Sequence, residues 1–462
     1  MILPNAFGHY AARGSFTPPQ LANMVFWGDA NTLAGGDGAL ISSFTDLSGN
    51  ANHATASGSL RPTLKTNIVN GKQVLRFDGT DDVMAWPNLF GAATTGTLVV
   101  MIKANADPAA SAITSKPWDL AKTGAVGSSA HSYTDGFIYE HFGSDTSVQA
   151  MPKPSSAASF HAYSVTIQAN KMVIHWNGVI IGGQDFSSPG FLAAPTLSDG
   201  TSKYAGDIAE IMLYKVVLSR AELKTINTYL AAKYAVSVAD VTTLATPSSF
   251  SGLQGWWKAD SLSLNDNDPV SSWTDSSGNG RTLTGTLTQR PLYKTNLYNG
   301  LPAVRWDGSN DRLEMAAEHS LGDLTFIGIA LSNVDNGNMF GHDIDNYQTR
   351  TRRGGNVMNF YANGGSEFIS SLAFKYAVTA FKLYGWTRNG TTGALTWWQN
   401  GVELEATAGN TTAFKFKSLG WNPFGIQFGG DMGEVCYWNT VLSRSDMARL
   451  YYEYFRDRWA LP

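Results

Sequence analysis

The sequence predicts an all-β protein built from two tandem domains, each closed by a C-terminal helix. Three observations support this prediction: a long internal repeat, a composition suited to strands and turns, and matching hairpin and helix signals in both halves. Glycine is abundant at 47 of 462 residues, aromatics make up 12%, and only 15% of the residues are charged. Such a mixture is typical of β-rich proteins with many tight turns.

The repeat defines the domains. Residues 44–84 match residues 273–313 without a gap, at the constant spacing of 229 that separates Asp46 from Asp275. A Gly-Asp-x-x-Glu segment then closes each copy, at Gly206 and at Gly430. A repeat of this length is a duplicated domain, because solenoid units recur every few tens of residues. The predicted organisation is an extended arm (1–23), domain 1 (24–236), a linker (237–252) and domain 2 (253–462).

The arm has no counterpart in the second copy. Phe7, Tyr10 and Phe16 stand between prolines and glycines, a pattern that suits docking onto a larger assembly. The alternative is a terminus without fixed structure, which is common at chain ends. The aromatic spacing places the docking arm on an equal footing with that alternative, since solvated tails have few aromatics.

Strands are predicted within domain 1 at 72–77 and 97–102, from their apolar and β-branched residues. The Ser-, Ala- and Gly-rich interval 105–160 permits no assignment. A hairpin is predicted in each domain, around Asn177-Gly178 and Asn400-Gly401. This dipeptide suits a two-residue type I′ turn, in which both residues need positive φ.

Each domain should end in an amphipathic helix. Ser219 with Glu222, and Ser443 with Asp446, have the spacing of a capping box. Apolar residues follow at helical spacing in both copies: Leu223, Ile226 and Leu230, then Met447, Leu450, Tyr451, Tyr454 and Phe455. Residues 237–252 are small and polar, as in a linker.

The ordered motifs also resemble a known family. WWKAD (256–260), WTDSSGN (273–279), RWDG (305–308) and the closing Gly-Asp-x-x-Glu, Leu-Ser-Arg and helix are similar to laminin-G-like domains of the concanavalin-A-like lectin and glucanase superfamily. Domain 1 departs from the pattern at 26–30, where FWGDA replaces WWKAD. The resemblance implies two concanavalin-A-like jelly-roll sandwiches, each of two antiparallel sheets, one of them concave. Members mostly bind glycans or proteins, some are enzymes, and they occur in secreted bacterial proteins and tailed-phage virions.

Two sets of acidic turns are candidate Ca²⁺ sites. Asp78 with Asp82, and Asp307 with Asp311, follow a predicted strand in each domain, and related laminin-G modules bind Ca²⁺ at a loop rim. The alternative is a tight turn in which the aspartates cap backbone N–H groups, and it is favoured. A second pair of loops, at Asp46 and Asp275, has oxygen side chains at alternate positions, but an Asx turn explains it better.

No catalytic constellation is recognisable. Glu210 and Glu434 each follow an Asp three residues earlier, and such positions on a strand point to opposite faces, so the pair cannot flank a glycosidic bond. A structural role as the buried partner of an Arg or a backbone N–H is predicted for them. There is no triad motif, zinc motif or phosphate-binding loop. The chain is therefore predicted not to be an enzyme, with a hydrolase or lyase of the same fold as the alternative.

Candidate ligand-binding residues come from domain 2, which holds ten of the fourteen tryptophans. Exposed flat rings stack on sugars and anchor partner surfaces. Alternation places Trp397 and Trp398 on opposite faces of a strand, so that one could be exposed. The candidates are Trp397, Trp398 and Trp421, together with Tyr347, Arg350, Arg352, Arg353 and Tyr361 of the basic segment 346–366, although a solvated basic loop is the simpler explanation of that segment.

The net charge, the apolar runs and the cysteine content limit the partners and the cross-links that we expect for this chain. A net charge of −4 gives no electrostatic case for nucleic acid, and no apolar run is long enough to span a membrane. The single cysteine, Cys436, excludes an intrachain disulfide. The N-terminal residues lack the pattern of a secretory signal.

These features lead to a hypothesis of a virion surface protein, either a capsid decoration or a tail-fibre component, made in the host cytoplasm. It would dock onto other virion proteins through its arm and present lectin-like domains to host polysaccharide or protein, with Ca²⁺ as a candidate cofactor. Self-association into a homo-oligomer is compatible with this hypothesis. A secreted, extracellular bacterial adhesin is the alternative.

Overall fold

The structure is a computed structural model. It describes residue 18 and residues 21–106, 115–123, 129–131, 137–144, 150–152, 156–169, 171–184, 188–199, 203–333, 337–342, 347–352, 357–362, 368–369, 381–407, 411–421, 425 and 427–461. Side chains are not described at 150–152, 184, 348, 350–352, 357–358 and 368–369. The predicted docking residues Phe7, Tyr10 and Phe16 lie outside the described residues.

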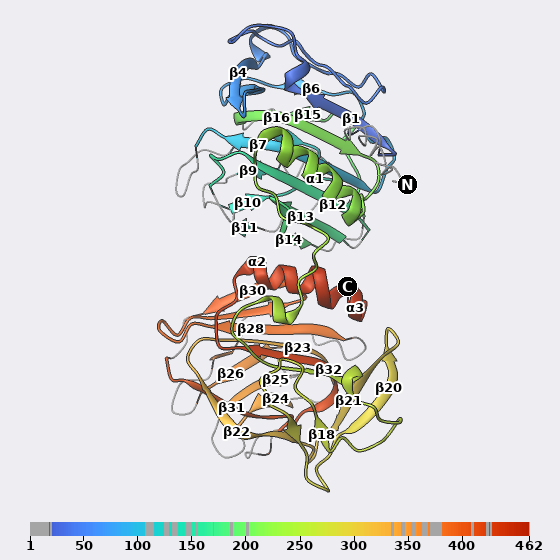
Figure 1. The fold of residues 1–462 in the computed structure, drawn as a ribbon, viewed down its shortest axis with the longest axis vertical. Helices are drawn as coiled ribbons and strands as arrows, with labels where there is room; N and C mark the ends of the chain where they lie inside the picture. The colour runs from blue at the N-terminus through green and yellow to red at the C-terminus, as the bar shows by residue number, and fades with distance from the viewer. Residues whose placement is uncertain are drawn as a thin grey trace, which may run out of the picture. The chain divides into compact units, whose positions relative to one another are not determined.

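Domain 1 is a β-sandwich (Figure 1). Its first layer has eight antiparallel strands in the order β14-β13-β12-β7-β16-β5-β4, with β1 also paired to β16. The bounds are β1 Met24–Asp29, β4 Thr63–Val69, β5 Lys72–Asp78, β7 Gly96–Ala104, β12 His161–Gln168, β13 Lys171–Trp176, β14 Val179–Gln184 and β16 Ala205–Tyr214. The predicted strands at 72–77 and 97–102 are thus confirmed as β5 and β7.

The second layer of domain 1 consists of shorter strands in two sheets, β2-β3-β6-β15-β8 and β11-β10-β9. The bounds are β2 Ser43–Phe44, β3 Ala54–Thr55, β6 Met84–Ala85, β8 Trp118–Asp119, β9 Ala130–His131, β10 Phe137–Tyr139, β11 Ala150–Pro152 and β15 Thr196–Leu197, with 3-10 turns η2 Ala30–Thr32 and η3 Gly58–Leu60. Four of these strands, β8 to β11, come from the interval 105–160 that the sequence left unassigned.

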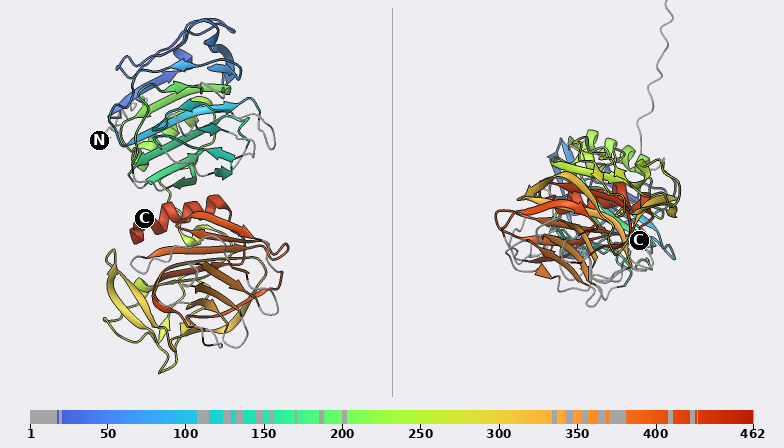
Figure 2. Two further views of the ribbon diagram at one scale, coloured as in Figure 1. Left: turned by 180° about the vertical axis from the view of Figure 1, so that it is seen from behind. Right: turned by 90° about the horizontal axis from the view of Figure 1, so that it is seen from below.

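Domain 2 repeats the architecture. Its first sheet has the order β20-β21-β32-β23-β28-β29-β30 with β17 on β32, and its second sheet the order β18-β19-β22-β31-β24-β25-β26-β27. The bounds are β17 Leu253–Lys258, β18 Ser272–Trp273, β19 Leu283–Thr284, β20 Leu292–Tyr298, β21 Leu301–Asp307, β22 Leu313–Leu321, β23 Leu324–Ser332, β24 Gly337–Gly341, β25 Gln348–Arg352, β26 Val357–Tyr361, β27 Phe368–Ile369, β28 Lys382–Arg388, β29 Leu395–Gln399, β30 Val402–Thr407, β31 Phe414–Leu419 and β32 Gly429–Trp438, with 3-10 turns η4 Pro247–Ser249 and η5 Ala259–Ser261. The chain therefore forms two jelly-roll sandwiches in tandem, and Figure 2 shows the ribbon from two further directions.

Both predicted hairpin turns are present. Asn177 and Gly178 have φ of 46° and 79°, and Asn400 and Gly401 have 50° and 74°, as a type I′ turn requires. They join β13 to β14 and β29 to β30. Two copies of one local signal thus gave the same turn in both domains.

Helix α1 (Arg220–Tyr234) closes domain 1 over the first sheet (Figure 1). Its capping box is complete: the Ser219 side chain accepts from the Glu222 N–H, and the Glu222 carboxylate accepts from the Ser219 N–H. The predicted face of Leu223, Ile226 and Leu230 is buried in a core cluster with strand residues such as Val99, Met101 and Met212.

The closing helix of domain 2 is not a regular α-helix throughout. It begins as α2 (Arg444–Arg449) behind the predicted capping box of Ser443 and Asp446, continues as a π-helical segment, η7 (Leu450–Phe455), and ends as α3 (Arg456–Trp459). The buried face includes Tyr452, whereas Tyr454 is only half-buried. The prediction of a regular 3.6-residue pattern through Tyr454 was wrong at this point because the π segment rotates the residues that follow it.

The predicted linker packs against both domains rather than crossing between them as a free tether. The chain divides into two compact units. Beyond residue 184, the boundary between these units lies between Thr242 and Thr243. On the domain 1 side, Val241 is buried and the Ala239 N–H donates to the Asn177 carbonyl. On the domain 2 side, Phe250 is buried and the Ala245 N–H donates to Glu453 Oε2.

Candidate functional site

The candidate site lies at one end of the second sheet of domain 2, where Trp421 follows strand β31. The Arg312 guanidinium lies over the Trp421 ring, 5.1 Å from its centroid. Arg312 also pairs with Glu314 at 3.2 Å. We call Arg312, Glu314 and Trp421 the Trp421 site. An aromatic ring with a flanking cation and carboxylate can stack on a sugar and hydrogen-bond its hydroxyl groups.

The backbone fixes the position of Trp421. Its carbonyl accepts from Asn338 Nδ2 at 2.7 Å and from the Ser418 hydroxyl at 3.3 Å. Gly420 before it has φ of 77°, and a Cβ there would lie 2.2 Å from the Trp306 ring. Only glycine fits this turn, so the local chain is held in one conformation. The residue is half-buried, and its buried Nε1–H has no hydrogen-bond partner in the part of the chain that the structure describes.

The other predicted aromatic contacts divide into buried and partly exposed rings. Trp397 (0% exposed), Trp398 (3%) and Tyr347 (5%) are buried, so they cannot stack on a ligand in this conformation. The expectation that one ring of the Trp397–Trp398 pair could be exposed was wrong, because the first sheet is covered on both faces, by the second sheet and by the closing helix. Tyr361 remains half-buried at the end of β26.

The predicted basic residues cannot be placed as contacts. Arg350 and Arg352 lie on β25, where their backbones pair with Asn359 and Val357 of β26. Their side chains, and the whole of Arg353, lie outside the described residues.

A charged cluster that the sequence did not indicate lies on the same sheet. Glu318 of β22 accepts from His342 Nε2 at 2.7 Å and pairs with Lys415 of β31 at 3.3 Å. The hydrogen bond from His342, together with Lys415, lowers the pKa of Glu318. Lys415 alternates with buried Phe414 and Phe416, which places it on the face of β31 away from the core. This cluster and the Trp421 site give the sheet a polar, charged surface.

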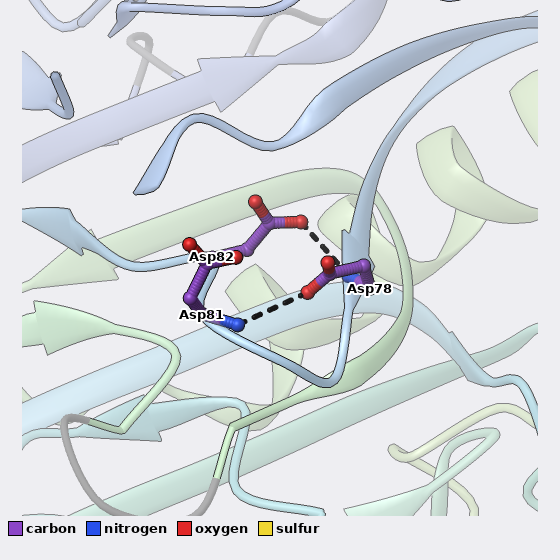
Figure 3. Close-up of side chains that lie close together, drawn as sticks. All are labelled: Asp78, Asp81 and Asp82. Carbon is purple, nitrogen blue, oxygen red and sulfur yellow. Dashed lines mark hydrogen bonds between the residues drawn. The ribbon is translucent and has the colours of Figure 1, made fainter. Parts of the chain in front are cut away.

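The predicted Ca²⁺ turns form identical hydrogen-bonded turns in both domains. Figure 3 shows the Asp82 carboxylate accepting from the Asp78 N–H and the Asp78 carboxylate accepting from the Asp81 N–H, at 2.8 and 3.3 Å. In domain 2, Asp311 and Asp307 take the same roles. These bonds give each aspartate a structural role in its turn.

The two turns differ in how well they would suit a cation. One oxygen from each of Asp78, Asp81 and Asp82 lies within 4.8 Å of the others, a donor set of the type Ca²⁺ prefers. In domain 2 the position of Asp81 is occupied by Asn310, which leaves two carboxylates. If either turn holds Ca²⁺, the residues of domain 1 fit it better.

The loops at Asp46 and Asp275 are Asx turns. Asp46 accepts from the N–H groups of Trp27, Ser48 and Asn52, at 2.9 to 3.0 Å. Asp275 accepts equivalent bonds from Trp256, Ser277 and Arg281. The preferred interpretation of these loops is confirmed.

Glu210 and Glu434 have the structural role expected of them. Glu210 accepts from Trp27 Nε1, Tyr229, Tyr234 and Lys233, at 2.7 to 2.9 Å. Glu434 accepts from its counterparts, Trp256, Tyr454, Arg458 and Trp459. Both carboxylates are fully buried, so a substrate cannot reach them. The charged partner of Glu210 is a lysine, not the predicted arginine.

A third buried acid, Glu140, was missed. It follows β10 in the unassigned interval and accepts from the Tyr163 hydroxyl (2.6 Å), the Phe142 N–H (2.9 Å) and the Ser129 hydroxyl. Burial alone would raise its pKa, but His131 and these hydrogen bonds lower it. No local sequence signal marks this residue, because its side-chain partners, Tyr163 of β12 and Ser129 beside β9, lie 23 and 11 residues away in the sequence.

Across the described residues, no helix has the length and apolarity needed to cross a membrane. No family model and no curated protein matches the chain.

Several solved structures are similar in fold. Domain 4 of AbnA, an extracellular arabinanase from Geobacillus stearothermophilus in complex with arabinotriose, is 18% identical with a TM-score of 0.32, covering 43% of this chain and 98% of that one. The ligand-binding domain of botulinum neurotoxin serotype D with N-acetylneuraminic acid is 8% identical (TM-score 0.36; 92% and 97% covered). Domains LG4-5 of the mouse laminin α1 chain are 10% identical (TM-score 0.25; 82% and 92% covered). At these scores the likenesses carry no argument about function.

Proposed function

We propose that the chain is a non-enzymatic binding protein that presents two tandem jelly-roll domains and recognises a glycan at the Trp421 site of domain 2. The Trp421 ring carries the proposal, because the residue is half-buried and is held by a glycine-dependent turn. Arg312 and Glu314 beside it supply a donor and an acceptor for sugar hydroxyls. The same features would suit a protein partner, which the test below includes.

The burial and the hydrogen bonding of the acidic side chains support a protein that binds a glycan without cleaving it. Glu210, Glu434 and Glu140 are fully buried and bonded to several donors each. A glycosidase needs two carboxyl groups that reach the scissile bond, about 5 to 10 Å apart. These three acids cannot meet that need, and Glu314 and Glu318 are paired with Arg312 and Lys415.

A binding assay tests the proposed site. The full chain should bind at least one member of a panel of bacterial surface polysaccharides and uronic-acid polymers, and Trp421→Ala should weaken that binding by about tenfold, which corresponds to about 1.4 kcal/mol for the loss of one stacked ring. Lys65→Ala, in an exposed pair with Asp37 in domain 1, is the control and should bind as the parent does. Equal binding by Trp421→Ala and the parent would exclude this site, and release of soluble sugar would favour the hydrolase or lyase alternative.

We further propose that the protein is displayed on a virion, as a capsid decoration or tail-fibre component, with its arm docked onto other virion proteins. The spaced aromatics of residues 1–23 support the docking arm. Cys436 is buried and unpaired, which is compatible with folding in a reducing cytoplasm. The competing proposal is an extracellular bacterial adhesin.

The protein composition of purified virus particles distinguishes the virion proposal from the adhesin proposal. The full chain should be present in purified particles, and removal of residues 1–23 should abolish its incorporation while both domains remain folded. Absence of the full chain from particles would exclude the virion proposal. Normal incorporation of the shortened chain would show that the arm is not the anchor.

A further inference from the structure

A groove in domain 1 lies between helix α1 and the segment 238–240 that follows it. Its volume is about 420 Å³, within the range of small-molecule sites. Its lining includes Lys224, Asn227, Ala231 and Ala232 of the helix, and Val238 and Asp240 of the segment. These residues all belong to the same compact unit of the chain, so the groove is a feature of domain 1.

Several contacts hold the segment in place against the domain. The Ala239 N–H donates to the Asn177 carbonyl at 2.8 Å, and Arg220 donates to the Val241 carbonyl at 3.3 Å. Gly178 has φ of 79°, and a Cβ there would lie 2.2 Å from the Ala239 carbonyl oxygen, so the turn approaches the segment this closely only with glycine. The wall of the groove is therefore fixed before a ligand arrives, which lowers the cost of binding.

Asn227 is the unexplained group at this groove. It lies on the buried face of α1 with Leu223, Ile226 and Leu230, and it is only 5% exposed. Its Nδ2 amide is buried and has no hydrogen-bond partner among the residues that the structure describes. A buried donor without an acceptor is costly, and a leucine would fill the same place without that cost. The amide therefore indicates an acceptor on a molecule in the groove.

The charged side chains of the groove compensate each other. Lys224 Nζ lies 2.6 Å from Asp240 Oδ2, and the other Asp240 oxygen accepts from the Thr242 N–H and hydroxyl. The hydrogen bond from Lys224, together with those from Thr242, lowers the pKa of Asp240 to about 2, so the carboxylate is ionised and balances the lysine. Because the pair has no net charge, the groove favours a neutral ligand.

The remaining lining is small and largely apolar. Ala231, Ala232 and Val238 present methyl groups, and Val238 packs against the buried core cluster of the domain. An acetamido group matches this combination, because its carbonyl oxygen accepts a hydrogen bond and its methyl group packs against other methyl groups. The exposed Thr228 hydroxyl and the Lys224–Asp240 pair can bond to hydroxyl groups beside it.

From these observations we propose that domain 1 binds a neutral acetamido sugar in this groove, with the Asn227 amide donating to the acetamido carbonyl. The acetyl methyl group lies against Ala231, Ala232 and Val238, and the sugar hydroxyl groups face the Lys224–Asp240 pair. The groove and the Trp421 site are in different domains, so the two can fail separately.

Saturation-transfer NMR with the full chain tests the proposal. N-acetylglucosamine and N-acetylgalactosamine are titrated beside glucose, which has a sugar ring without the acetamido group, and N-acetylglycinamide, which has the acetamido group without a sugar ring. We expect saturable binding of at least one acetamido sugar in the millimolar range, with the strongest saturation at the acetyl methyl protons. The Trp421→Ala chain should give the same result.

Three outcomes would overturn the proposal. No saturable binding, or equal binding of glucose, would mean that the groove does not recognise an acetamido sugar. Loss of binding in the Trp421→Ala chain would place the sugar at the Trp421 site. Tighter binding of N-acetylglycinamide than of either sugar would identify a peptide as the partner.

Variants then locate the binding. Asn227→Leu removes the donor at nearly constant volume and should weaken binding by about tenfold or more, without lowering the melting temperature, because the amide it removes is unsatisfied. Ala232→Trp fills the groove from an exposed helix position and should abolish binding. Thr225→Trp, exposed on the same helix but outside the lining, is the matched control and should bind as the parent does. Unchanged affinity in both groove variants would place the sugar elsewhere and overturn the proposal.

Discussion

At the scale of single residues, Glu210 and Glu434 show how the glutamate of a Gly-Asp-x-x-Glu segment can stabilise the fold without taking part in catalysis. Each lies on the last strand of its first sheet and collects donors from the closing helix and from the domain's first strand. Burying a carboxylate is costly unless it is paired and hydrogen-bonded. The four donors satisfy that need and tie the helix to the sheet.

We expect Glu434→Ala to destabilise domain 2 by about 3 to 5 kcal/mol, because it leaves Arg458 with Asp260 as its remaining acidic partner and leaves three further donors without their acceptor. Glu434→Gln should cost less, since the amide oxygen still accepts. Asp446→Ala, which removes only the capping-box carboxylate of the same helix, is the control, expected to cost about 1 kcal/mol. Urea unfolding followed by tryptophan fluorescence measures all three, and an Ala variant no worse than the control would contradict the proposed role.

The aspartates of the acidic turns predict a pH dependence. Burial raises the pKa of both Asp82 and Asp311 to about 6 in the folded protein, from 3.8. The folded state therefore binds the proton more tightly, so this contribution to stability is complete below pH 3.8 and is lost as the pH rises through 6. The double variant Asp82→Asn/Asp311→Asn keeps an acceptor but does not titrate. The difference in free energy of unfolding between parent and variant should shift against the parent from pH 4 to pH 6.5; a constant difference would contradict the prediction.

At the scale of elements, the closing helix of domain 2 has one residue more than that of domain 1 between its N-cap and the residue that binds the buried glutamate. Ser219 and Ser443, at the N-caps, are 224 positions apart, whereas Lys233 and Arg458, which bind the two buried glutamates, are 225 apart. An extra residue in an α-helix rotates everything after it by about 100°. The π segment Leu450–Phe455 absorbs the insertion, so that Arg458 still faces Glu434.

This interpretation predicts an asymmetry between deletions. Removing Glu453 should convert the π segment to α-helix and leave Arg458 beside Glu434, at the cost of the bonds from Glu453 to Arg449 and Ala245. Removing Thr228, at the aligned place in regular α1, should instead rotate Lys233 away from Glu210 and destabilise domain 1 by about 3 to 5 kcal/mol. Unfolding curves of the two deletions compare these costs. Equal losses would show that the π segment does not compensate for an insertion.

Elements could be predicted from the sequence where the signal was local. The Asn-Gly turns and the capping boxes each depend on a few adjacent residues, and both copies of each were found. The π segment could not be predicted, because its cause is the position of Glu434 on a distant strand. The short strands β8 to β11 could not be predicted for the same reason, because they are defined by their pairing partners and not by their own residues.

At the scale of the whole molecule, the repeat predicted the duplicated fold, but it did not predict the candidate binding site. The repeat fixed which residues are equivalent, and the two first sheets have the same order of strands. Trp398, opposite Gly385, and His175, opposite Ser164, occupy equivalent places in the two hairpins, and both are buried. Exposure depends on packing across layers, which neither alternation within a strand nor tryptophan content reveals, and so Trp397 and Trp398 were assigned to a surface they do not reach.

The packing of residues 237–252 on both units predicts where the chain can be divided. Fragments 21–242 and 243–462 should each fold alone with β-dominated circular dichroism. Fragment 21–236 should be less stable than 21–242 by about 1 to 3 kcal/mol, because it loses buried Val241 and the backbone bond from Ala239 to Asn177. Likewise, fragment 253–462 loses Phe250 and the Ala245 bond to Glu453. Urea unfolding of the four fragments measures these differences. If the shorter member of each pair proves as stable as the longer, residues 237–252 are a tether after all, as their composition alone suggests.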